Sequence, residues 1–428
     1  MSSRLHVVVV GGGVIGLSCA YYLARGGARV TLLERDHVGA GASWGNAGTV
    51  SAGHPPLNRP GRVRDGLRQM LDPTSPLYIQ PRVDVKLWKW LYDFAIHCTD
   101  DHVEHAMRIM APLGKEAFAL FTELVHEERI QCGYRPEGYF DVCSTESGLD
   151  GARHEAGIIE RYGYHPEHLD GEELRRREPA FSESVIGGVY YPEAAILQPS
   201  RFLTSLADAL LRHGGAILEG VDVREVRVVA GRVTGVRTTA SSVTDNSMIK
   251  GDSLGADVVV LATGPFSLAM ARVAGARLPV QPGKGYHRDI EIGPNGAPAL
   301  NVACVLSESS VFCTPMDTFV RFAGTMEFSG SNHVMRHDRL RQLTTAAREA
   351  FPALGSARPN SEWVGLRPMS ADGLPIVGPL GDVEGLVVAT GHGMLGLTLG
   401  PLTGQMVANQ VLGGEEPRLE GLSPDRFR

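Results

Sequence analysis

The chain has 428 residues and a formal net charge of −7, with 41 basic and 48 acidic side chains. Hydrophobic residues make up 43% and charged residues 21%, so the chain can bury a large core and form two or three domain-sized units. This composition excludes intrinsic disorder, and the acidic balance argues against a nucleic-acid partner. The 52 glycines predict many tight turns and close backbone contacts.

Two features of the sequence indicate its cellular setting. The 6 cysteines are widely spaced and form no C-x-x-C pair, which is typical of reduced thiols in a cytoplasmic protein. The apolar stretch from Val7 to Ala24 resembles a signal peptide, but three glycines interrupt it and a second apolar run that ends at Glu34 continues it. We therefore interpret this stretch as part of the fold. No other segment reaches the ~20 uncharged apolar residues of a membrane span.

The N-terminal segment predicts a strand, a helix and a second strand. The run Leu5–Val10 is rich in Val without polar alternation, which is typical of a strand buried in a parallel sheet. Apolar residues then recur at helical spacing as far as Arg25, and Gly26 and Gly27 end this helix. The run Arg29–Leu33 predicts the second strand, so the segment has the order of a βαβ unit.

The turn inside this unit carries the pattern G-x-G-x-x-G. We expect Gly11 to form the tight turn, Gly13 to let a pyrophosphate approach the backbone, and Gly16 to let helix and strand pack closely. The following helix points its partial positive charge at the phosphates. Glu34, 18 residues after Gly16, is placed to accept a hydrogen bond from a ribose hydroxyl. The sequence therefore predicts a dinucleotide site, and the small-residue loop 39–49 after the acid favours a flavin over a nicotinamide.

The remaining elements are predicted in chain order. Residues 54–81 are rich in Pro and predict an irregular segment. Helices are expected over residues 85–94, 106–126, 171–177 and 199–211, and strands over 138–142 and on both sides of Gly231 within 216–237. The polar segment 238–255 predicts a surface loop.

Two later segments resemble the first strand. The runs 258–264 and 386–391 are apolar and end in small residues, and a predicted helix to Leu412 follows the second run. We interpret the three runs as parts of one dinucleotide-binding sheet. The predicted domains therefore interleave, with a dinucleotide-binding domain over residues 1–55, 195–275 and 360–428 and a substrate-binding domain over residues 56–194 and 276–359.

Five motifs occur in an order that matches a known family. They are the glycine fingerprint and the segments 46–48, 283–286, 365–373 and 391–396. Together they resemble the FAD-dependent D-amino-acid oxidase superfamily, and most closely its bacterial D-amino-acid dehydrogenases, over nearly the full length. The resemblance implies a Rossmann-like, mainly parallel α/β domain for FAD and an interleaved α+β domain built on a mixed or antiparallel sheet.

The resemblance and the fingerprint together indicate the residues that contact FAD. We expect these contacts from Gly11, Gly13, Val14, Ile15, Gly16, Glu34, Arg35, Ser43, Asn46, Ala47, Gly48, Val223, Thr263, Gly264, Gly391, His392, Gly393, Met394, Leu395 and Gly396. Relatives that attach flavin covalently use a His in the loop after the acid or a Cys near the Gly-Leu-Arg-Pro motif. This chain has Gly45 and Met369 there, so the resemblance implies noncovalent FAD.

The family's reaction implies roles for four residues. In oxidative deamination of D-amino acids, a hydride passes from Cα to flavin N5, and the imine becomes a 2-oxo acid and ammonia. The resemblance implies that Arg367 binds the substrate carboxylate. The alternative is that Arg367 forms an ion pair with an acidic residue of the chain. The resemblance also implies that Tyr286 is a pocket residue that could contact the substrate; the alternative is a core aromatic whose hydroxyl is hydrogen-bonded. It further implies that a backbone carbonyl near Met394 accepts a hydrogen bond from the substrate amine. The role of His54, where relatives often have an aromatic residue, stays open.

The sequence leaves alternatives open for the substrate, the electron acceptor and the class of function. The resemblance implies a D-amino acid, with D-proline and hydroxy-D-proline included, and a quinone-type electron acceptor. The alternatives are a glycine- or sarcosine-type amine oxidase that uses oxygen and a non-enzymatic dinucleotide-binding protein. The site needs no metal, because His97, His102 and His105 match no known metal-ligand spacing. We interpret them as a solvated helix start that is capped by Thr99 or Asp100.

A basic stretch precedes an aromatic one between residues 59 and 94. Arg59, Arg62, Arg64 and Arg68 lie just before the run 88–94, which contains two Trp residues. One interpretation is a solvated loop beside a packed helix. The other is a basic face that contacts anionic lipid, since dehydrogenases of this type pass electrons towards membrane quinones. The corresponding location is the cytoplasm, with peripheral contact at the inner face of the cell membrane as the alternative.

Overall fold

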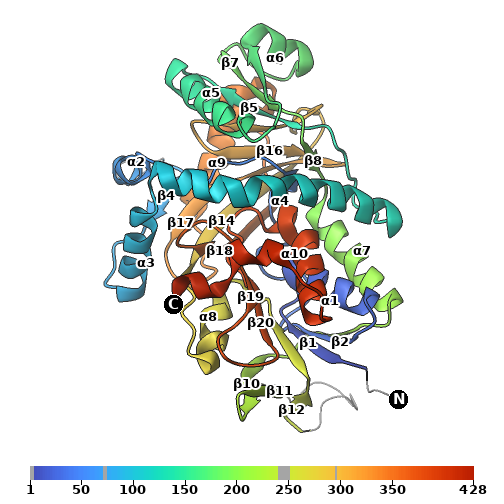
Figure 1. Ribbon diagram of the computed structural model, residues 1–428. Coiled ribbons are helices and arrows are strands. Elements are labelled where there is room, and N and C mark those ends of the chain that lie inside the picture. The colour runs from blue at the N-terminus through green and yellow to red at the C-terminus, as the bar shows by residue number, and fades with distance from the viewer. Residues whose placement is uncertain (1–3, 71–74, 240–250, 295) are drawn as a thin grey trace.

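The computed structural model describes residues 4–70, 75–239, 251–294 and 296–428 (Figure 1). Within these ranges, a six-stranded sheet contains the predicted N-terminal unit. Its strands, in spatial order, are β19 (Ile376–Pro379), β20 (Leu386–Thr390), β13 (Val258–Leu261), β1 (His6–Val10), β2 (Arg29–Leu33) and β9 (Ala216–Leu218). All neighbours pair in parallel except β19 and β20, which are antiparallel. The three apolar runs predicted to share a sheet are therefore adjacent in it.

Four helices pack against one face of this sheet. They are α1 (Val14–Arg25), α4 (Asp100–Glu127), α7 (Pro199–Arg212) and α10 (Gly396–Val411). Figure 1 shows α1 and α10 side by side, with the long α4 running across them. The backbones of α1 and α10 approach so closely that a Cβ at Gly404 would collide with the backbone of Ser18. This contact brings the N-termini of α1 and α10 to the same edge of the sheet.

A small antiparallel sheet covers the other face. Its strands are β10 (Val223–Val229), β11 (Arg232–Thr238) and β12 (Ser253–Gly255). The predicted surface loop over 238–255 is wrong at its end, because residues 253–255 pair with β11. The middle of that loop, residues 240–250, lies outside the described residues.

A second, nine-stranded sheet forms the other large unit. Its spatial order is β18 (Ser361–Ser370), β14 (Val280–Glu291), β17 (Phe319–Phe328), β16 (Val311–Pro315), β15 (Ala303–Leu306), β5 (Tyr139–Cys143), β7 (Gly187–Tyr191) and β6 (Glu167–Asp170), with β4 (Leu77–Ile79) beside β17. Most pairs are antiparallel, but β5–β15 and β4–β17 are parallel. The sheet is thus mixed, and the two units together confirm the predicted fold class.

Short elements complete the described chain. The strands β3 (Thr49–Ser51) and β8 (Ala194–Ile196) form a two-stranded pair. The remaining α-helices are α2 (Arg62–Gln69), α3 (Val85–Ile96), α5 (Glu146–Glu160), α6 (Gly171–Arg177), α8 (Ser267–Met270) and α9 (His337–Ala350). The helix α9 covers the nine-stranded sheet on the side away from the six-stranded one. Among the described helices, none is long and apolar enough to cross a membrane.

Two local predictions need correction, and one strand lies outside the sheet that its predicted domain contains. The Pro-rich segment 54–81 is not wholly irregular, because it contains α2 and β4. The helix predicted over 106–126 begins at Asp100, since the polar first turn hid its start. The strand β18, placed by the predicted boundaries in the dinucleotide-binding domain, pairs with β14 of the larger sheet. The domain boundaries themselves stay a prediction.

Candidate active site

A cavity of about 1270 Å³ lies between the two sheets. One wall is formed by the carboxyl ends of β1, β2, β13 and β20, where open α/β sheets bind their ligands. The opposite wall is formed by β14, β17 and β18 of the larger sheet. The volume exceeds the roughly 300–1,000 Å³ of pockets for drug-sized ligands, so the cavity has room for a long ligand and a second, small one.

The glycine fingerprint follows β1 on the wall that the six-stranded sheet forms, and it has the predicted geometry. Gly11 has a φ of +109°, and a Cβ there would lie 2.5 Å from the carbonyl oxygen of Ala262. A Cβ at Gly16 would collide with the carbonyl oxygen of Gly11, so Gly16 serves the packing of α1 on β1 and does not line the cavity. Gly13 is the N-cap of α1, and a Cβ there would meet only the Ser43 hydroxyl. The N-terminus of α1 is therefore open to a phosphate.

The acidic residue after β2 is fixed against the same turn. The Glu34 carboxylate accepts hydrogen bonds from the amides of Gly12 (2.6 Å) and Asp36 (3.0 Å) and lines the cavity. The neighbouring Arg35 guanidinium lies over the Phe266 ring at 4.4 Å. A carboxylate with oxygens held at this position can accept the hydroxyls of a ribose.

The loop after the acid is held in place by its own side chains and by the larger sheet. Asn46 donates to the Ser43 carbonyl and accepts from the Gly48 amide, both at 2.7 Å. The Ser43 hydroxyl accepts from the Val14 amide at the start of α1. Arg321, ion-paired with Asp289 at 2.8 Å, donates to the Asn46 carbonyl. These bonds fix the loop against both units.

An aromatic ring fills the space that a side chain at Gly45 would need. A Cβ at Gly45 would collide with the indole of Trp363, which stacks on His287. The Gly45 carbonyl oxygen lies 2.7 Å from His287 Nδ1. Position 45 therefore has no space for a larger side chain unless Trp363 moves.

Three side chains on the cavity wall each have a buried polar atom that lacks a hydrogen-bond partner among the described residues. His392 Nε2 bonds the Thr403 hydroxyl at 3.0 Å, whereas its buried Nδ1 has no partner in the described part of the chain. Burial lowers the pKa of His392 to about 3, so its ring is neutral. The hydroxyls of Ser370 and Thr49 line the same cavity and also lack partners within the described ranges. Because unpaired buried polar atoms are unfavourable, this part of the cavity fits a ligand with polar ring atoms.

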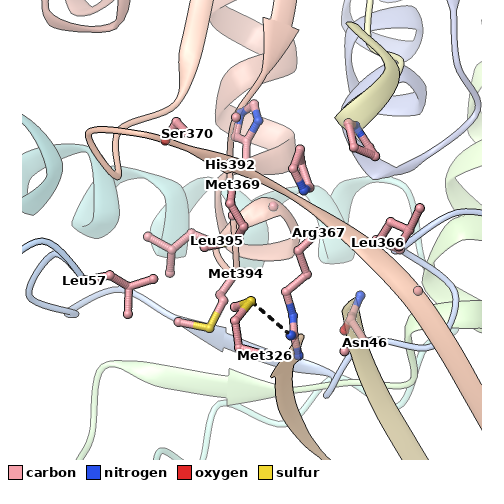
Figure 2. A pocket seen from close by; sticks show the side chains of 18 of the residues that line it. Asn46, Leu57, Met326, Leu366, Arg367, Met369, Ser370, His392, Met394 and Leu395 are labelled. Carbon is pink, nitrogen blue, oxygen red and sulfur yellow. Dashed lines mark hydrogen bonds between the residues drawn. The ribbon is translucent and has the colours of Figure 1, made fainter. Parts of the chain in front are cut away.

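Arg367 lies on β18, at the wall of the cavity (Figure 2). Its Nη1 donates to the Thr325 carbonyl at 2.6 Å, and its guanidinium lies against Gly285, where a Cβ would collide with it. Figure 2 shows the same nitrogen near the Met326 sulfur, at 4.0 Å. Burial lowers the pKa of Arg367 to about 10, so the group is charged at neutral pH. Among the described residues, none brings a carboxylate within ion-pair distance of it, which contradicts the alternative of an internal ion pair.

The backbone acceptor for Arg367 is unusual. Thr325 has a φ of +67°, which β-branched residues rarely adopt, and it lies where the pairing of β14 with β17 shifts register. Strained backbone of this kind persists where the surrounding structure holds it and is concentrated at functional sites. Here the strained residue is Thr325, and its carbonyl oxygen accepts the hydrogen bond from Arg367.

Tyr286, predicted as a pocket residue, borders the cavity but turns its side chain away from Arg367. It pairs with Val364 across β14 and β18, so its side chain points to the face opposite Arg367 and packs in the core beneath α9. Its hydroxyl donates to the buried Glu327 carboxylate at 2.9 Å, and burial raises its pKa. Tyr286 borders the cavity, but its side chain packs in the core with a hydrogen-bonded hydroxyl, as the alternative interpretation expected. Its contact with substrate stays a prediction.

The cavity continues past His54 towards a polar end. The His54 ring is half-buried and stacks on Tyr139 at 6.0 Å, and burial lowers its pKa, so the ring is neutral at pH 7. Beyond it, burial and the nearby Glu155 raise the pKa of Asp141 to about 7, while Arg59 pairs with Glu155. Sequence analysis missed this acid, because a single Asp within a strand carries no motif.

The remaining predicted residues are brought together as expected. Met394 is 51% exposed at the cavity wall, and Figure 2 shows it with Leu395 and Met369 near Arg367. With the exception of Gly16, every residue predicted to contact the cofactor lines the cavity. Sequence analysis missed Thr325 and Trp363 and gave Gly285 no role of its own, because the proximity of these residues depends on strand register.

The histidine cluster near residue 100 is used structurally. Thr99 caps α4 by accepting from the His102 amide, as one of the two expected caps. The rings of His97 and His102 each bond a backbone carbonyl, those of Asp93 (2.6 Å) and Asp372 (2.7 Å). No group of three or more potential ligands that could hold a metal ion occurs among the described residues.

Comparisons with known proteins agree with this geometry. Residues 6–410 match the model of a family described as FAD dependent oxidoreductase. The chain is 34% identical to a D-amino acid dehydrogenase of Methylobacterium nodulans, covering 99% of both, and 31% identical to one of Xanthobacter autotrophicus, covering 97% of both.

Two solved structures share the fold. A glycine oxidase from Bacillus cereus has a TM-score of 0.77 and 24% identity, covering 98% of each chain. An L-proline dehydrogenase from P. horikoshii has a TM-score of 0.73 and 18% identity, covering 100% of this chain and 98% of that chain. At these identities, the two structures support the fold and not a choice of substrate.

Proposed function

Since this chain belongs to the FAD-dependent oxidoreductase family, we propose that it catalyses the oxidative deamination of D-amino acids. The observation that carries this proposal is the charged, desolvated Arg367, which has only backbone carbonyls and a thioether as partners among the described residues. The similarity to two D-amino acid dehydrogenases over nearly the full length supports the substrate class. The same guanidinium argues against a non-enzymatic dinucleotide-binding protein, which needs no such anchor.

The residues present fit FAD, the cofactor of the family. The α1 N-terminus beside Gly13 would take the pyrophosphate, and Glu34 would take the ribose. The unpartnered His392 Nδ1 and the Ser370 hydroxyl would face the flavin end, with the N-terminus of α10 near the flavin pyrimidine edge. Bound FAD supplies the acceptor for the hydride that leaves the substrate Cα.

Arg367 would bind and orient the substrate through its carboxylate. A guanidinium can bond a carboxylate with two parallel N–H groups, and the described chain takes up only its Nη1 with backbone carbonyls. The backbone carbonyl near Met394 would accept from the substrate amine. With the carboxylate and Cα hydrogen both fixed, only one enantiomer keeps its side chain in the open part of the cavity. We assign this to the D enantiomer from the two relatives.

The product of hydride loss is an imine, which water hydrolyses to a 2-oxo acid and ammonia. A cyclic secondary amine such as D-proline or hydroxy-D-proline is compatible with this site, because the hydride leaves from Cα whether the nitrogen carries one carbon substituent or two. His54 and Tyr139, at the side of the cavity, are placed to contact the substrate side chain. The choice among D-amino acids would depend on this region.

We expect the Arg367→Ala variant to retain FAD but to lose activity. Removing a charge-assisted, two-point contact lowers kcat/KM by about a hundredfold to a few thousandfold, equivalent to about 3–5 kcal/mol. Arg367→Lys should recover little, because an ammonium group cannot reproduce the guanidinium fork. The exposed Arg224→Ala variant serves as the control. Steady-state kinetics with a D-amino acid and a dye acceptor measure the effect, and an Arg367→Ala variant within about threefold of wild type contradicts the anchor.

FAD is bound noncovalently in this proposal. Position 45 has no side chain that can form a bond to flavin, and the Trp363 ring occupies the space beside it. Acid precipitation of the holoenzyme should therefore release the yellow colour into the supernatant. Colour that stays in the protein pellet would contradict noncovalent binding.

Electrons pass to a quinone-type acceptor in this proposal, as the dehydrogenase relatives support. We expect a quinone analogue to reoxidise the reduced enzyme much faster than oxygen does. Stopped-flow absorbance after anaerobic reduction measures both rates. Rapid reoxidation by oxygen with formation of peroxide would instead favour the amine-oxidase alternative.

A further inference from the structure

One wall of the cavity is a row of side chains that crosses the nine-stranded sheet. Ala323 of β17 pairs with Phe312 of β16, and Phe312 pairs with Val305 of β15. Val305 in turn pairs with Asp141 of β5. All four residues line the cavity. Because directly paired residues share a face of the sheet, this row is apolar over three strands and ends in a carboxyl group.

The apolar end of this row lies beside the Arg367 guanidinium. That group lies against Gly285 of β14 and donates to the carbonyl of Thr325, two residues along β17 from Ala323. The strands β17 and β5 are three strand spacings apart, since β16 and β15 lie between them. At ~4.8 Å per spacing, the separation is roughly 14 Å. A substrate whose carboxylate lies on Arg367 therefore reaches Asp141 only through a long side chain.

The carboxyl group of Asp141 has an unused acceptor atom. Its Oδ1 is buried and has no hydrogen-bond partner among the described residues. Such an atom is unfavourable unless a ligand supplies a donor. Burial and the nearby Glu155 also raise the pKa of Asp141 to about 7, because both disfavour its negative charge. A positively charged ligand group would offset both effects and would bring N–H donors to the free oxygen.

The other charged residues at this end of the cavity are used elsewhere in the chain. Arg59 and Arg62 line the cavity, but within the described ranges neither forms an ion pair or hydrogen bond with Asp141. Arg59 pairs instead with Glu155 of α5. Glu308 accepts from two backbone amides just before α5. Asp141 therefore keeps an acceptor for a ligand, whereas the other two acids are bonded within the chain.

We infer that the Asp141 end of the cavity is a subsite for a positively charged side-chain terminus, so that the enzyme takes D-amino acids of the lysine and arginine class. The aliphatic stem of such a side chain would lie along Phe312 and Val305, and its terminal N–H groups would bond Asp141. The subsite rests on the proposed function, because Arg367 is taken as the anchor of the carboxylate. A short side chain such as that of D-alanine would leave Asp141 unpaired.

Binding of two matched carboxylates to the holoenzyme tests the subsite without turnover. The first, 6-aminohexanoate, has the carboxylate, stem and ammonium group of lysine but no α-amine to oxidise. The second, heptanoate, has a methyl group in place of the ammonium. We expect 6-aminohexanoate to bind about tenfold or more tightly than heptanoate in isothermal titration calorimetry, because its ammonium bonds a charged acceptor. Equal binding of the two, or tighter binding of heptanoate, would overturn the proposal.

Replacement of Asp141 assigns the preference to its carboxyl group. The Asp141→Asn variant keeps the shape of the side chain and removes its charge, so the ratio of the two affinities should fall by about tenfold. The matched control is Asp208→Asn, which makes the same change on the exposed side of α7, away from the cavity, and should keep the wild-type ratio. An unchanged ratio in Asp141→Asn, or equal weakening of both carboxylates, would overturn the assignment.

Steady-state kinetics of the wild type extend the test to substrates. The kcat/KM for D-lysine should exceed that for D-2-aminoheptanoate, its analogue with a terminal methyl group, by about tenfold or more. A preference for D-glutamate would assign this end of the cavity to Arg62 and overturn the proposal. Oxidation of D-alanine without a preference for D-lysine would contradict the subsite alone. If no D-amino acid reduces the flavin, the proposed function is contradicted, whereas tighter binding of 6-aminohexanoate would still support the subsite.

Discussion

A partly buried positive charge that has no negative partner among the described residues constrains the centre of this molecule. The guanidinium of Arg367 is desolvated enough to lower its pKa to about 10, yet the described chain offers it backbone carbonyls and the Met326 sulfur only. Removing a charge from water without a counter-charge is expensive, and proteins usually neutralise such groups or pair them. In the proposed function, the substrate carboxylate supplies the opposite charge, so the site would favour anionic substrates.

Several features of the larger sheet make room for the Arg367 guanidinium or bind it. Gly283 and Gly285 of β14 pair with Arg367 and Gly365 of β18. The absence of a side chain at Gly285 leaves room for the guanidinium, and at Gly283 it leaves room for Met326 and Met369. The register shift between β14 and β17 accompanies the left-handed Thr325, whose carbonyl holds Nη1. The first unit contributes the other wall, where the N-termini of α1 and α10 meet because glycines allow these helices to touch.

The parts of this architecture that depend on local sequence were predictable. The turn, helix and acid around Gly11 and Glu34 form one short βαβ unit, so spacing alone indicates their geometry. Arg367 was identified through the family's motif and not through any physical pattern. The direction of the Tyr286 side chain could not be predicted, because it is set by pairing with β18, some eighty residues away. The left-handed Thr325 could not be predicted either, since strand register is a property of the folded chain.

Anaerobic titration of the holoenzyme with the two enantiomers of one amino acid tests the central claim most directly. If Arg367 and the hydride acceptor together orient the substrate, the D enantiomer should bleach the flavin absorbance completely, and the L enantiomer should leave it unchanged. D-proline is a useful second pair with L-proline, because its ring removes side-chain rotation as a variable. Bleaching by both enantiomers at similar rates, or by glycine and sarcosine alone, would contradict the account.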